Sequence, residues 1–413
     1  MHEEYRIAGI DVHKNMLAVV ITDVAAGAEF HFDRRKFGTL DSDLKELSQW
    51  LGEFGVKEAV MESTAQYWKT VWRQLEQQCV LHLAQAQSNR APRGRKRDFA
   101  DAERLVRRHV AGELILSFVP DVEQRLWRTI TRTKYQLTRD RVRLQNQLES
   151  LLEDGRLKLG SCVSDLLGVS SRRMLRAVAK GESDPATLAA LAEENLQATP
   201  EQLADAMSAA RNLSKLHRQI LKLFLDRLDL IEDQLQILHR QIAKALRQHQ
   251  EAVVRLATVP GFGVDSAQQV IAEVGPSAAT FPSAEQLASW VGVCPGREES
   301  AAVSKSNRSP KGNRMMRRVL VQVANAAVKS QGSIFPLHYR RLVGRMGHNK
   351  TIWCIAHRLC KLVWIILHRG MEYVEYGAER SAKALQKRTA KQLRELRALG
   401  YQILPPTPQE KLA

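Results

Sequence analysis

The spacing of hydrophobic residues predicts alternating strands and helices over roughly the first 85 residues. Helices are predicted over 41–54, with Asp41 or Ser42 as the N-cap, and over 66–78. Strands are predicted over 5–12, 16–23, 28–37, 56–62 and 80–85. Three successive strands followed by helix, strand, helix and strand is the order of RNase H-like domains.

From about Val119 to Ala252 the spacing becomes helical. Apolar residues recur every three, four or seven positions from Leu126 to Leu151. A second run takes steps of three and four without a break, at Leu228, Ile231, Leu235, Leu238, Ile242 and Ala245. This run predicts a coiled-coil seam, in an antiparallel hairpin or a dimer contact. One face of an ordinary bundle helix is an equally good interpretation.

A third helical region begins near residue 253. Its turn, Pro260-Gly261-Phe262-Gly263, lies between two helical patterns and resembles a helix-hairpin-helix. Such a turn could present backbone N–H groups to a phosphate, or it could be purely structural. The apolar stretch 351–370 contains Arg358 and Lys361, so it is predicted to be a mostly buried helix and not a membrane span.

The expected fold class is therefore α/β plus α, in four regions. We expect an RNase H-like domain over 1–118 and a helical, coiled-coil linker domain over 119–252. A mostly helical domain with the helix-hairpin-helix-like element follows over 253–372, and a basic, helical and then disordered tail over 373–413.

The amino-acid composition indicates a polyanionic binding partner. The 413 residues carry a formal charge of +17, and clustered Lys and Arg bind phosphates, so nucleic acid is the expected partner. The five cysteines are scattered without a C-x-x-C pair, which fits reduced thiols and excludes a disulfide framework or zinc finger. No signal peptide is recognisable, so a cytoplasmic location without membrane contact is expected.

Four carboxylates are candidates for a shared site. Asp11 ends the apolar run IAGID, where a buried charge needs a partner, and Glu62 ends a predicted strand. Asp98 and Asp101 are spaced to share one face near a helix start. A cluster of four acids is tolerable with cations bound, and oxygen ligands suit Mg²⁺; two such ions can assist phosphoryl transfer. Each acid alone could instead be an N-cap or an ion-pair member.

Two basic segments complete the candidate site. Arg93, Arg95, Lys96 and Arg97 adjoin the Asp pair and could grip a nucleic-acid backbone. From Ser300 to Met371 there are 14 Lys and Arg and no acid, which favours a phosphate-binding surface over a solvated face of mixed charge. A helix is predicted to begin near Asn313. The basic candidates in this segment are Lys305, Arg308, Lys311, Arg314, Arg317 and Arg318.

The chain resembles a known family. The sequences IDVHK, MESTAQYW, GRKRDFADA, VPGFG and GVCPGREES followed by KGNRMMRRVL occur in the order found in insertion-sequence transposases that pair a RuvC-like DEDD domain with a C-terminal domain carrying a nucleophilic serine. The resemblance runs from about residue 5 to about 375.

The resemblance implies a site-specific DNA recombinase of bacteria, found at the nucleoid. It makes residues 1–118 the RuvC-like DEDD domain, with the tetrad Asp11, Glu62, Asp98 and Asp101, and residues 253–372 the serine-containing transposase domain. Ser300 would form a covalent phosphoserine link with DNA. Ala301 and Ala302 follow it where the family often has Gly. Ser304 and Ser306 are weaker alternative candidates for the nucleophile. The implied partners are donor and target DNA, a structured noncoding guide RNA, and further copies in a dimer or tetramer.

Two other functions remain open. A RuvC-like, structure-specific endonuclease would hydrolyse branched DNA with water and form no covalent intermediate. A non-catalytic nucleic-acid-binding scaffold would use the four acids in salt bridges. A serine hydrolase of the α/β type is disfavoured because no G-x-S-x-G elbow occurs.

Overall fold

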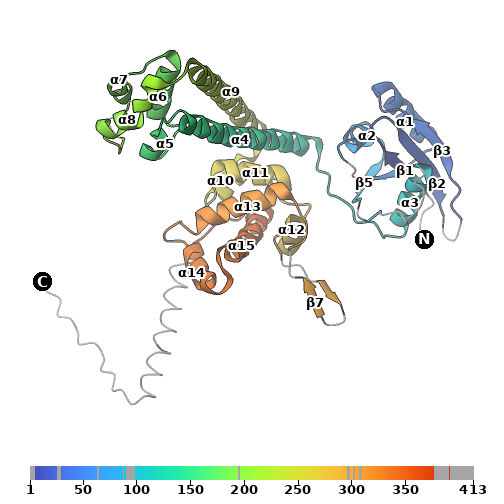
Figure 1. The fold of residues 1–413 in the computed structure, drawn as a ribbon. Coiled ribbons are helices and arrows are strands. Elements are labelled where there is room, and N and C mark those ends of the chain that lie inside the picture. Colours follow the sequence, from blue (N-terminus) through green and yellow to red (C-terminus); the bar gives the residue numbers. More distant parts are fainter. Residues whose placement is uncertain are drawn as a thin grey trace. The chain divides into compact units, whose positions relative to one another are not determined.

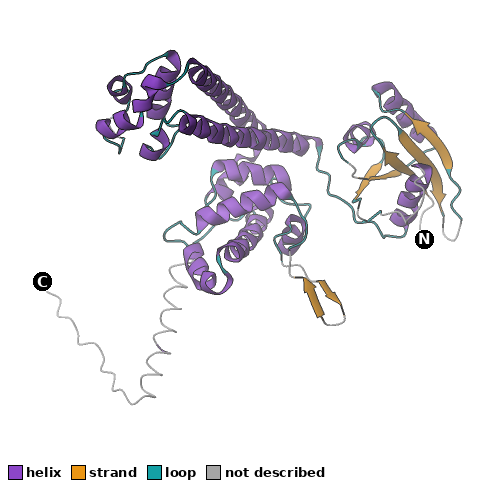
Figure 2. Ribbon diagram, viewed as in Figure 1, coloured by secondary structure: helices purple, strands orange, loops and turns teal. Residues whose placement is uncertain are grey.

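The computed structural model describes residues 5–25, 29–62, 65–86, 88–89, 98–193, 196–294, 298–300, 303–306, 309–375 and 390. The chain divides into two compact units, which we call the N-terminal unit, 1–121, and the C-terminal unit, 122–413. Figure 2 shows an α/β N-terminal unit and, among the described residues of the C-terminal unit, helices and one hairpin.

The N-terminal unit is built on a five-stranded mixed sheet of order β3-β2-β1-β4-β5 (Figure 1). Its strands are β1 (Tyr5–Val12), β2 (Leu17–Val24), β3 (Asp33–Phe37), β4 (Glu58–Glu62) and β5 (Val80–Ala84). The first three form an antiparallel meander, and β4 and β5 continue parallel to β1. The predicted order of elements is confirmed. The third strand begins at residue 33 instead of 28, because its pairing with β2 begins only where Asp33 meets Ile21.

Helices cover both faces of this sheet. Helices α1 (Asp41–Glu53) and α2 (Trp68–Leu75) pack on one face over Ala8, Ile10 and Met61. Helix α3 (Asp98–Val110) packs on the other face. Asp41 and Ser42 were wrong as N-caps of α1: the cap residue is Leu40, whose backbone N–H donates to the Asp43 carboxylate at 3.0 Å. Asp41 is already the first helical residue, so the cap lies one residue before it, and the Asp43 carboxylate satisfies the N–H group of Leu40.

Two long helices begin the C-terminal unit, α4 (Val122–Asp154) and α9 (Lys215–Ala245), and they pack along one another. Lys134 meets His239, and Arg141 meets Glu232. Because the residue number rises along α4 as it falls along α9, the two helices are antiparallel. Between them lie α5 (Leu159–Cys162), α6 (Val169–Lys180), α7 (Pro185–Ala189), α8 (Pro200–Ala206) and the 3₁₀ turn η1 (Ser208–Asn212).

The rest of the C-terminal unit is a helical body. It comprises η2 (Arg247–His249), α10 (Gln250–Ala257), α11 (Val264–Val274), α12 (Ala284–Val291), α13 (Arg314–Ala327), α14 (Ile334–Met346) and α15 (His348–Arg369). Strands β6 (Glu298–Ser300) and β7 (Val303–Ser306) form an antiparallel hairpin. Helix α13 begins after Asn313, as predicted, and its apolar side is buried at Val319, Leu320, Val323 and Ala327.

The glycine turn between α10 and α11 has a packing reason. Gly261 has φ +89, and a Cβ there would lie 2.4 Å from the Val323 carbonyl oxygen of α13. The Gly263 N–H donates to Ser266 Oγ, so that amide is already satisfied within the turn. Close approach of the turn to the backbone of α13 therefore accounts for this glycine, and contact of the turn with a phosphate stays a prediction.

Helix α15 is long and apolar enough to cross a membrane by length and composition. In the structure it is a core helix, as predicted from the sequence. Ile355, Leu359 and Val363 are buried, and α12, α13 and α14 pack against it.

Candidate carboxylate centre and basic surface

The position of α3 on the sheet depends on Gly9 of β1. A Cβ at Gly9 would lie 2.4 Å from the Ala102 carbonyl oxygen and 2.7 Å from a Val106 methyl group. Only a glycine lets the helix backbone come this close. Residues two apart in a strand share a face, so Asp11 lies on the same face of β1, toward the beginning of α3.

The four predicted acids come together at one end of this face. Ile10 of β1 lies beside Met61 of β4, so Asp11 and Glu62 follow on neighbouring parallel strands. Asp98 and Asp101 form the first turn of α3. The charges of Asp101 and Glu62 both act on Asp11, and His13 lies between Asp11 and Asp98, with Nε2 3.0 Å from one carboxylate and 3.9 Å from the other.

Electrostatics distinguish the two carboxylates that flank His13. Burial raises the pKa of Asp11, and the neighbouring Asp101 and Glu62 raise it further, against the lowering effect of His13. The pKa of Asp98 is lowered, chiefly by its hydrogen bond from Lys36, whose Nζ is 2.9 Å away. Asp11 thus bears a charge that its surroundings oppose, while the charge of Asp98 is compensated.

Polar neighbours hold the remaining two acids. Asn89 Nδ2 donates to Glu62 at 2.9 Å, and Arg104 donates to Asp101 at 2.5 Å and to the Asn89 side chain at 3.3 Å. These partners were not predicted from the sequence. The Asp101–Arg104 spacing of three could have indicated one of them, whereas Lys36 and Asn89 are brought in by the fold alone.

This arrangement fits divalent metal ions. The donors are carboxylate oxygens, the ligands that Mg²⁺ prefers, and their mutual repulsion at Asp11 would be relieved by a cation. Asp98 and Asp101 remain partly exposed, with side chains 37% and 20% accessible, so solvent and substrate can reach them. The residues present could therefore hold the metal ions that assist phosphoryl transfer.

The predicted nucleophile lies in the hairpin of the C-terminal unit. Ser300 is the last residue of β6 and pairs with Val303 of β7, and Ser304 and Ser306 are also in β7. For Ser300 and Lys305 the backbone alone is described. Arg93, Arg95, Lys96, Arg97 and Arg308 lie outside the described residues.

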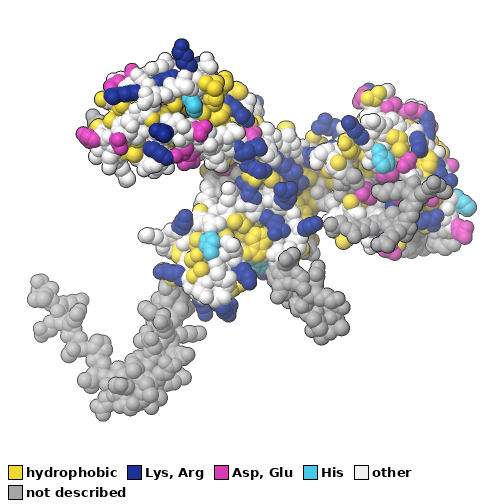
Figure 3. Space-filling view, viewed as in Figure 1, with side chains coloured by type: hydrophobic (Ala, Val, Ile, Leu, Met, Phe, Trp, Pro, Cys, Tyr) yellow, Lys and Arg dark blue, Asp and Glu magenta, His cyan; other side chains and the backbone are white. Residues whose placement is uncertain are grey.

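The basic residues at the beginning of α13 and just before it differ in their exposure. Lys311 and Arg314 are exposed. Arg317 stacks 4.8 Å from the Trp353 ring, and Arg318 lies 4.1 Å from the Tyr135 ring, half-buried, where burial lowers its pKa. Figure 3 shows Lys and Arg side chains over the body around α13 and α14 with few acidic ones between them, as the acid-free segment predicts.

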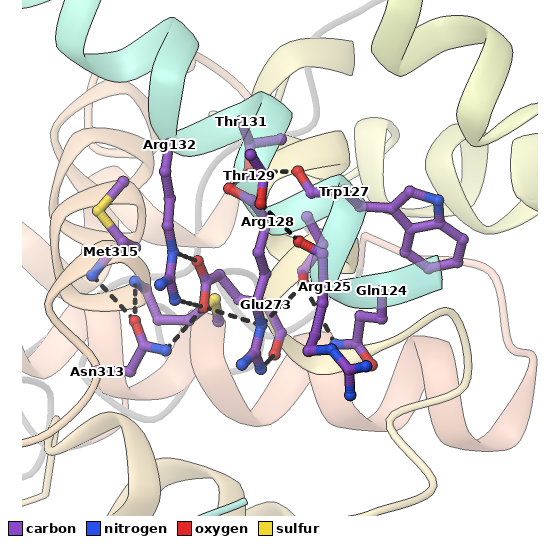
Figure 4. Close-up of polar contacts among 12 residues, drawn as sticks. Gln124, Arg125, Trp127, Arg128, Thr129, Thr131, Arg132, Glu273, Asn313 and Met315 are labelled. Carbon is purple, nitrogen blue, oxygen red and sulfur yellow. Dashed lines mark hydrogen bonds and ion pairs between the residues drawn. The ribbon is translucent and has the colours of Figure 1, made fainter. Parts of the chain in front are cut away.

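A buried ion-pair network, absent from the sequence analysis, fixes the beginning of α13 (Figure 4). Glu273 of α11, with a side chain 2% exposed, accepts two hydrogen bonds of 2.9 Å from Arg132 of α4. Asn313 Nδ2 also donates to Glu273, at 2.8 Å, while Asn313 Oδ1 caps α13 by accepting from the N–H groups of Met315 and Met316. The network ties three helices together just after the segment that holds Ser300.

Comparison with known proteins finds two family matches along the chain. The family described as "Transposase IS116/IS110/IS902 family" matches residues 253–340, and a DEDD transposase family of the IS110 type matches residues 8–155. A "Probable family 20 transposase" of Pseudomonas aeruginosa is 27% identical over 288 residues, which are 68% of this chain and 75% of that protein. The "Transposase for insertion sequence element IS1111A" of Coxiella burnetii is 28% identical over 32% of this chain and 36% of its own length.

Among solved structures, Thermus thermophilus RuvC in complex with a Holliday junction substrate aligns with 27% of this chain and 99% of its own, at 11% identity and a TM-score of 0.22. The two family matches define the class of protein: a transposase, an enzyme that processes DNA by phosphoryl transfer. Within this class, residues 8–155 and 253–340 match domains of IS110-family insertion-sequence transposases.

Proposed function

We propose that the protein is the recombinase of an insertion sequence and joins donor to target DNA through a covalent phosphoserine intermediate. Asp11, Glu62, Asp98 and Asp101 would hold two Mg²⁺ ions, and Ser300 would be the nucleophile. The observation that carries the proposal is the convergence of the four acids on the α3 face of the sheet.

In the proposed first step, the Ser300 hydroxyl attacks the scissile phosphorus. A phosphorus–Oγ bond forms, the bond from phosphorus to a deoxyribose oxygen breaks, the hydroxyl loses its proton, and the leaving sugar oxygen gains one. Rejoining reverses these changes with a sugar hydroxyl of the second DNA, so no nucleotide cofactor is consumed. Bound Mg²⁺ would stabilise the attacking and leaving oxygens. Asn89, Arg104 and Lys36 hold the acids in place.

The proposed partners are donor DNA, target DNA and a structured noncoding RNA encoded beside the gene, which would guide target choice. Support for nucleic acid is the acid-free segment 300–371, with Lys311 and Arg314 exposed on it. The support for guidance by RNA is the family resemblance. We place the activity in the bacterial cytoplasm, at the nucleoid.

We further propose a homo-oligomer, a dimer or tetramer, formed with α9. Leu216, Leu223, Leu230 and Ile237 recur every seven residues on α9, and each is between 49% and 64% exposed. Residues seven apart form one stripe along a helix, opposite to the seam that packs on α4. A second copy of the same stripe would cover this apolar surface.

The proposal is tested with the full chain, the RNA transcribed from the element's noncoding end, and donor and target DNA in Mg²⁺. A covalent adduct should appear on a denaturing gel, and peptide mapping should place it on Ser300. Ser300→Ala should bind nucleic acid but form neither adduct nor recombinant DNA. Asp11→Asn should lose activity by more than about 100-fold while still binding DNA.

Ser304→Ala and Ser306→Ala serve as matched controls and should recombine normally. If one of them abolishes the adduct and Ser300→Ala does not, the nucleophile is assigned wrongly. If the wild type cleaves DNA without any adduct, the protein is instead a hydrolytic endonuclease. If Asp11→Asn keeps full activity, the carboxylate centre has no catalytic part.

A further inference from the structure

A second cluster of metal-ligating side chains lies at the other end of the α3 face. It consists of Glu58, the first residue of β4, His82 of β5 and His109 in the last turn of α3. Val60 lies beside His82 in the parallel register, and Glu58, two residues before Val60, faces the same way. The cluster is therefore held by three elements, β4, β5 and α3. His109 lies about 16 Å along α3 from Asp98.

The distances within the cluster allow hydrogen bonds to Glu58 and also fit a metal ion. His82 Nε2 is 3.2 Å and His109 Nε2 is 3.5 Å from the same oxygen, Glu58 Oε2. The longer distance exceeds a good hydrogen bond. Ligand atoms about 2.0–2.1 Å from a tetrahedral zinc ion lie about 3.3 Å apart. The ligating atoms of the three residues all lie within 4.8 Å of one another.

The surroundings also suit an ion. The imidazoles of His82 and His109 lie against each other, with ring centroids 4.3 Å apart. A neutral imidazole offers its lone pair to a metal. The side chains are 14% to 30% exposed, which leaves an open side for a water molecule as fourth ligand.

We infer that Glu58, His82 and His109 form a binding site for a divalent transition-metal ion, with Zn²⁺ as the best fit. Two nitrogen donors favour Zn²⁺ over Mg²⁺, which prefers oxygen. The ion would join the end of α3 to β4 and β5. Because α3 carries Asp98 and Asp101 in its first turn, the ion would fix the helix that bears half of the carboxylate centre.

The test is a titration of the metal-stripped full chain with Zn²⁺ in millimolar Mg²⁺, with binding measured by calorimetry. A second titration uses Co²⁺ in place of Zn²⁺, because tetrahedral Co²⁺ absorbs visible light. The wild type should bind one ion with a Kd below about 1 μM and unfold at a higher temperature with Zn²⁺. His109→Gln and Glu58→Gln should each weaken binding by at least about 100-fold. His31→Gln, at an exposed histidine of the same unit, should bind as the wild type does.

Asp11→Asn separates this site from the carboxylate centre. It should keep the tight Zn²⁺ site while losing Mg²⁺-dependent activity. If Asp11→Asn removes Zn²⁺ binding and His109→Gln does not, the ion belongs to the carboxylate centre and the inference is wrong. Absence of binding tighter than about 10 μM in the wild type would equally overturn it. Because Glu58→Gln preserves size and shape, its circular dichroism distinguishes a loss of ligation from a loss of folding.

Discussion

Asp11 and Asp98 have opposite electrostatic roles although the same histidine lies between them. Burial raises the pKa of Asp11, and Lys36 lowers the pKa of Asp98. An acid with a raised pKa in the folded state costs stability when ionised, and this cost disappears as the pH falls through that pKa. An acid with a lowered pKa stabilises the fold at neutral pH, and this contribution is lost in acid.

We therefore expect Asp11→Asn to raise the melting temperature of the metal-free protein at pH 7, and the difference from the wild type to vanish toward pH 3. Asp98→Asn should lower the melting temperature at pH 7, with its effect also vanishing in acid. Thermal unfolding in EDTA, followed by circular dichroism, measures both. Excess Mg²⁺ should reverse the sign for Asp11→Asn, because it stabilises the wild type alone. If Asp11→Asn lowered the melting temperature at pH 7 in EDTA, the ionised Asp11 would not destabilise the metal-free fold.

Gly9 is the residue on which the approach of α3 depends. Gly9→Ala places a methyl carbon against the Ala102 carbonyl oxygen, so α3 must shift. We expect a loss of about 1–3 kcal/mol in the free energy of unfolding. We also expect the folded variant to lose recombination activity, because Asp98 and Asp101 move with the helix. Gly344→Ala, where a Cβ meets nothing within 4 Å in an exposed stretch of α14, should be neutral or slightly stabilising. Urea unfolding compares the two variants.

At the scale of secondary-structure elements, the Glu273 network couples α4, α11 and the beginning of α13. Glu273→Ala leaves the guanidinium groups of Arg128 and Arg132 without their shared carboxylate partner. We expect a loss of about 3–5 kcal/mol in unfolding free energy. Asp226→Ala, which breaks the exposed pair of Lys222 and Asp226 on α9, should cost less than about 1 kcal/mol. Equal losses of unfolding free energy for the two substitutions would show that the network stabilises the fold no more than an exposed ion pair does.

The exposed stripe of α9 gives a second prediction at this scale. Leu223→Glu combined with Leu230→Glu should reduce the molar mass measured by light scattering, because charges cannot be buried between two copies. The fold should persist, since both side chains are exposed within the chain. Leu40→Glu, at a leucine 72% exposed on the N-terminal unit, is the matched control and should leave the mass unchanged. An unchanged mass for the double variant would exclude the stripe as the contact.

At the scale of the whole molecule, the formal charge of +17 is distributed unevenly, with an acid-free stretch over 300–371. Removing one Lys or Arg that binds a phosphate should reduce the slope of log K against log salt by about 1. We expect Lys311→Ala with Arg314→Ala to weaken DNA binding and, by the same rule, to reduce this slope by about 2. Lys45→Ala, at an exposed lysine paired with Asp41, should change neither. Fluorescence anisotropy over a salt series makes the measurement, and an unchanged slope would exclude phosphate binding by Lys311 and Arg314.

Much of the fold could be predicted from local patterns in the sequence. The strand and helix order of the first 85 residues, the start of α13 at Asn313 and the buried character of α15 could be predicted, because hydrophobic period and capping chemistry act within a few residues. The acids Asp11, Glu62, Asp98 and Asp101 were recognisable as a set from chain order and residue type.

Long-range contacts decided the rest. The closeness of α3 to Gly9, the contacts of Lys36, Asn89 and Arg104 with the acids, and the Glu273 network join residues up to 145 positions apart. The meeting of Glu58, His82 and His109 likewise depends on strand register and on the length of α3. No local pattern encodes such distances, because which residues meet is fixed only when strands pair and helices pack; the sequence alone determined the elements and their chemistry, and the tertiary structure decided which side chains meet.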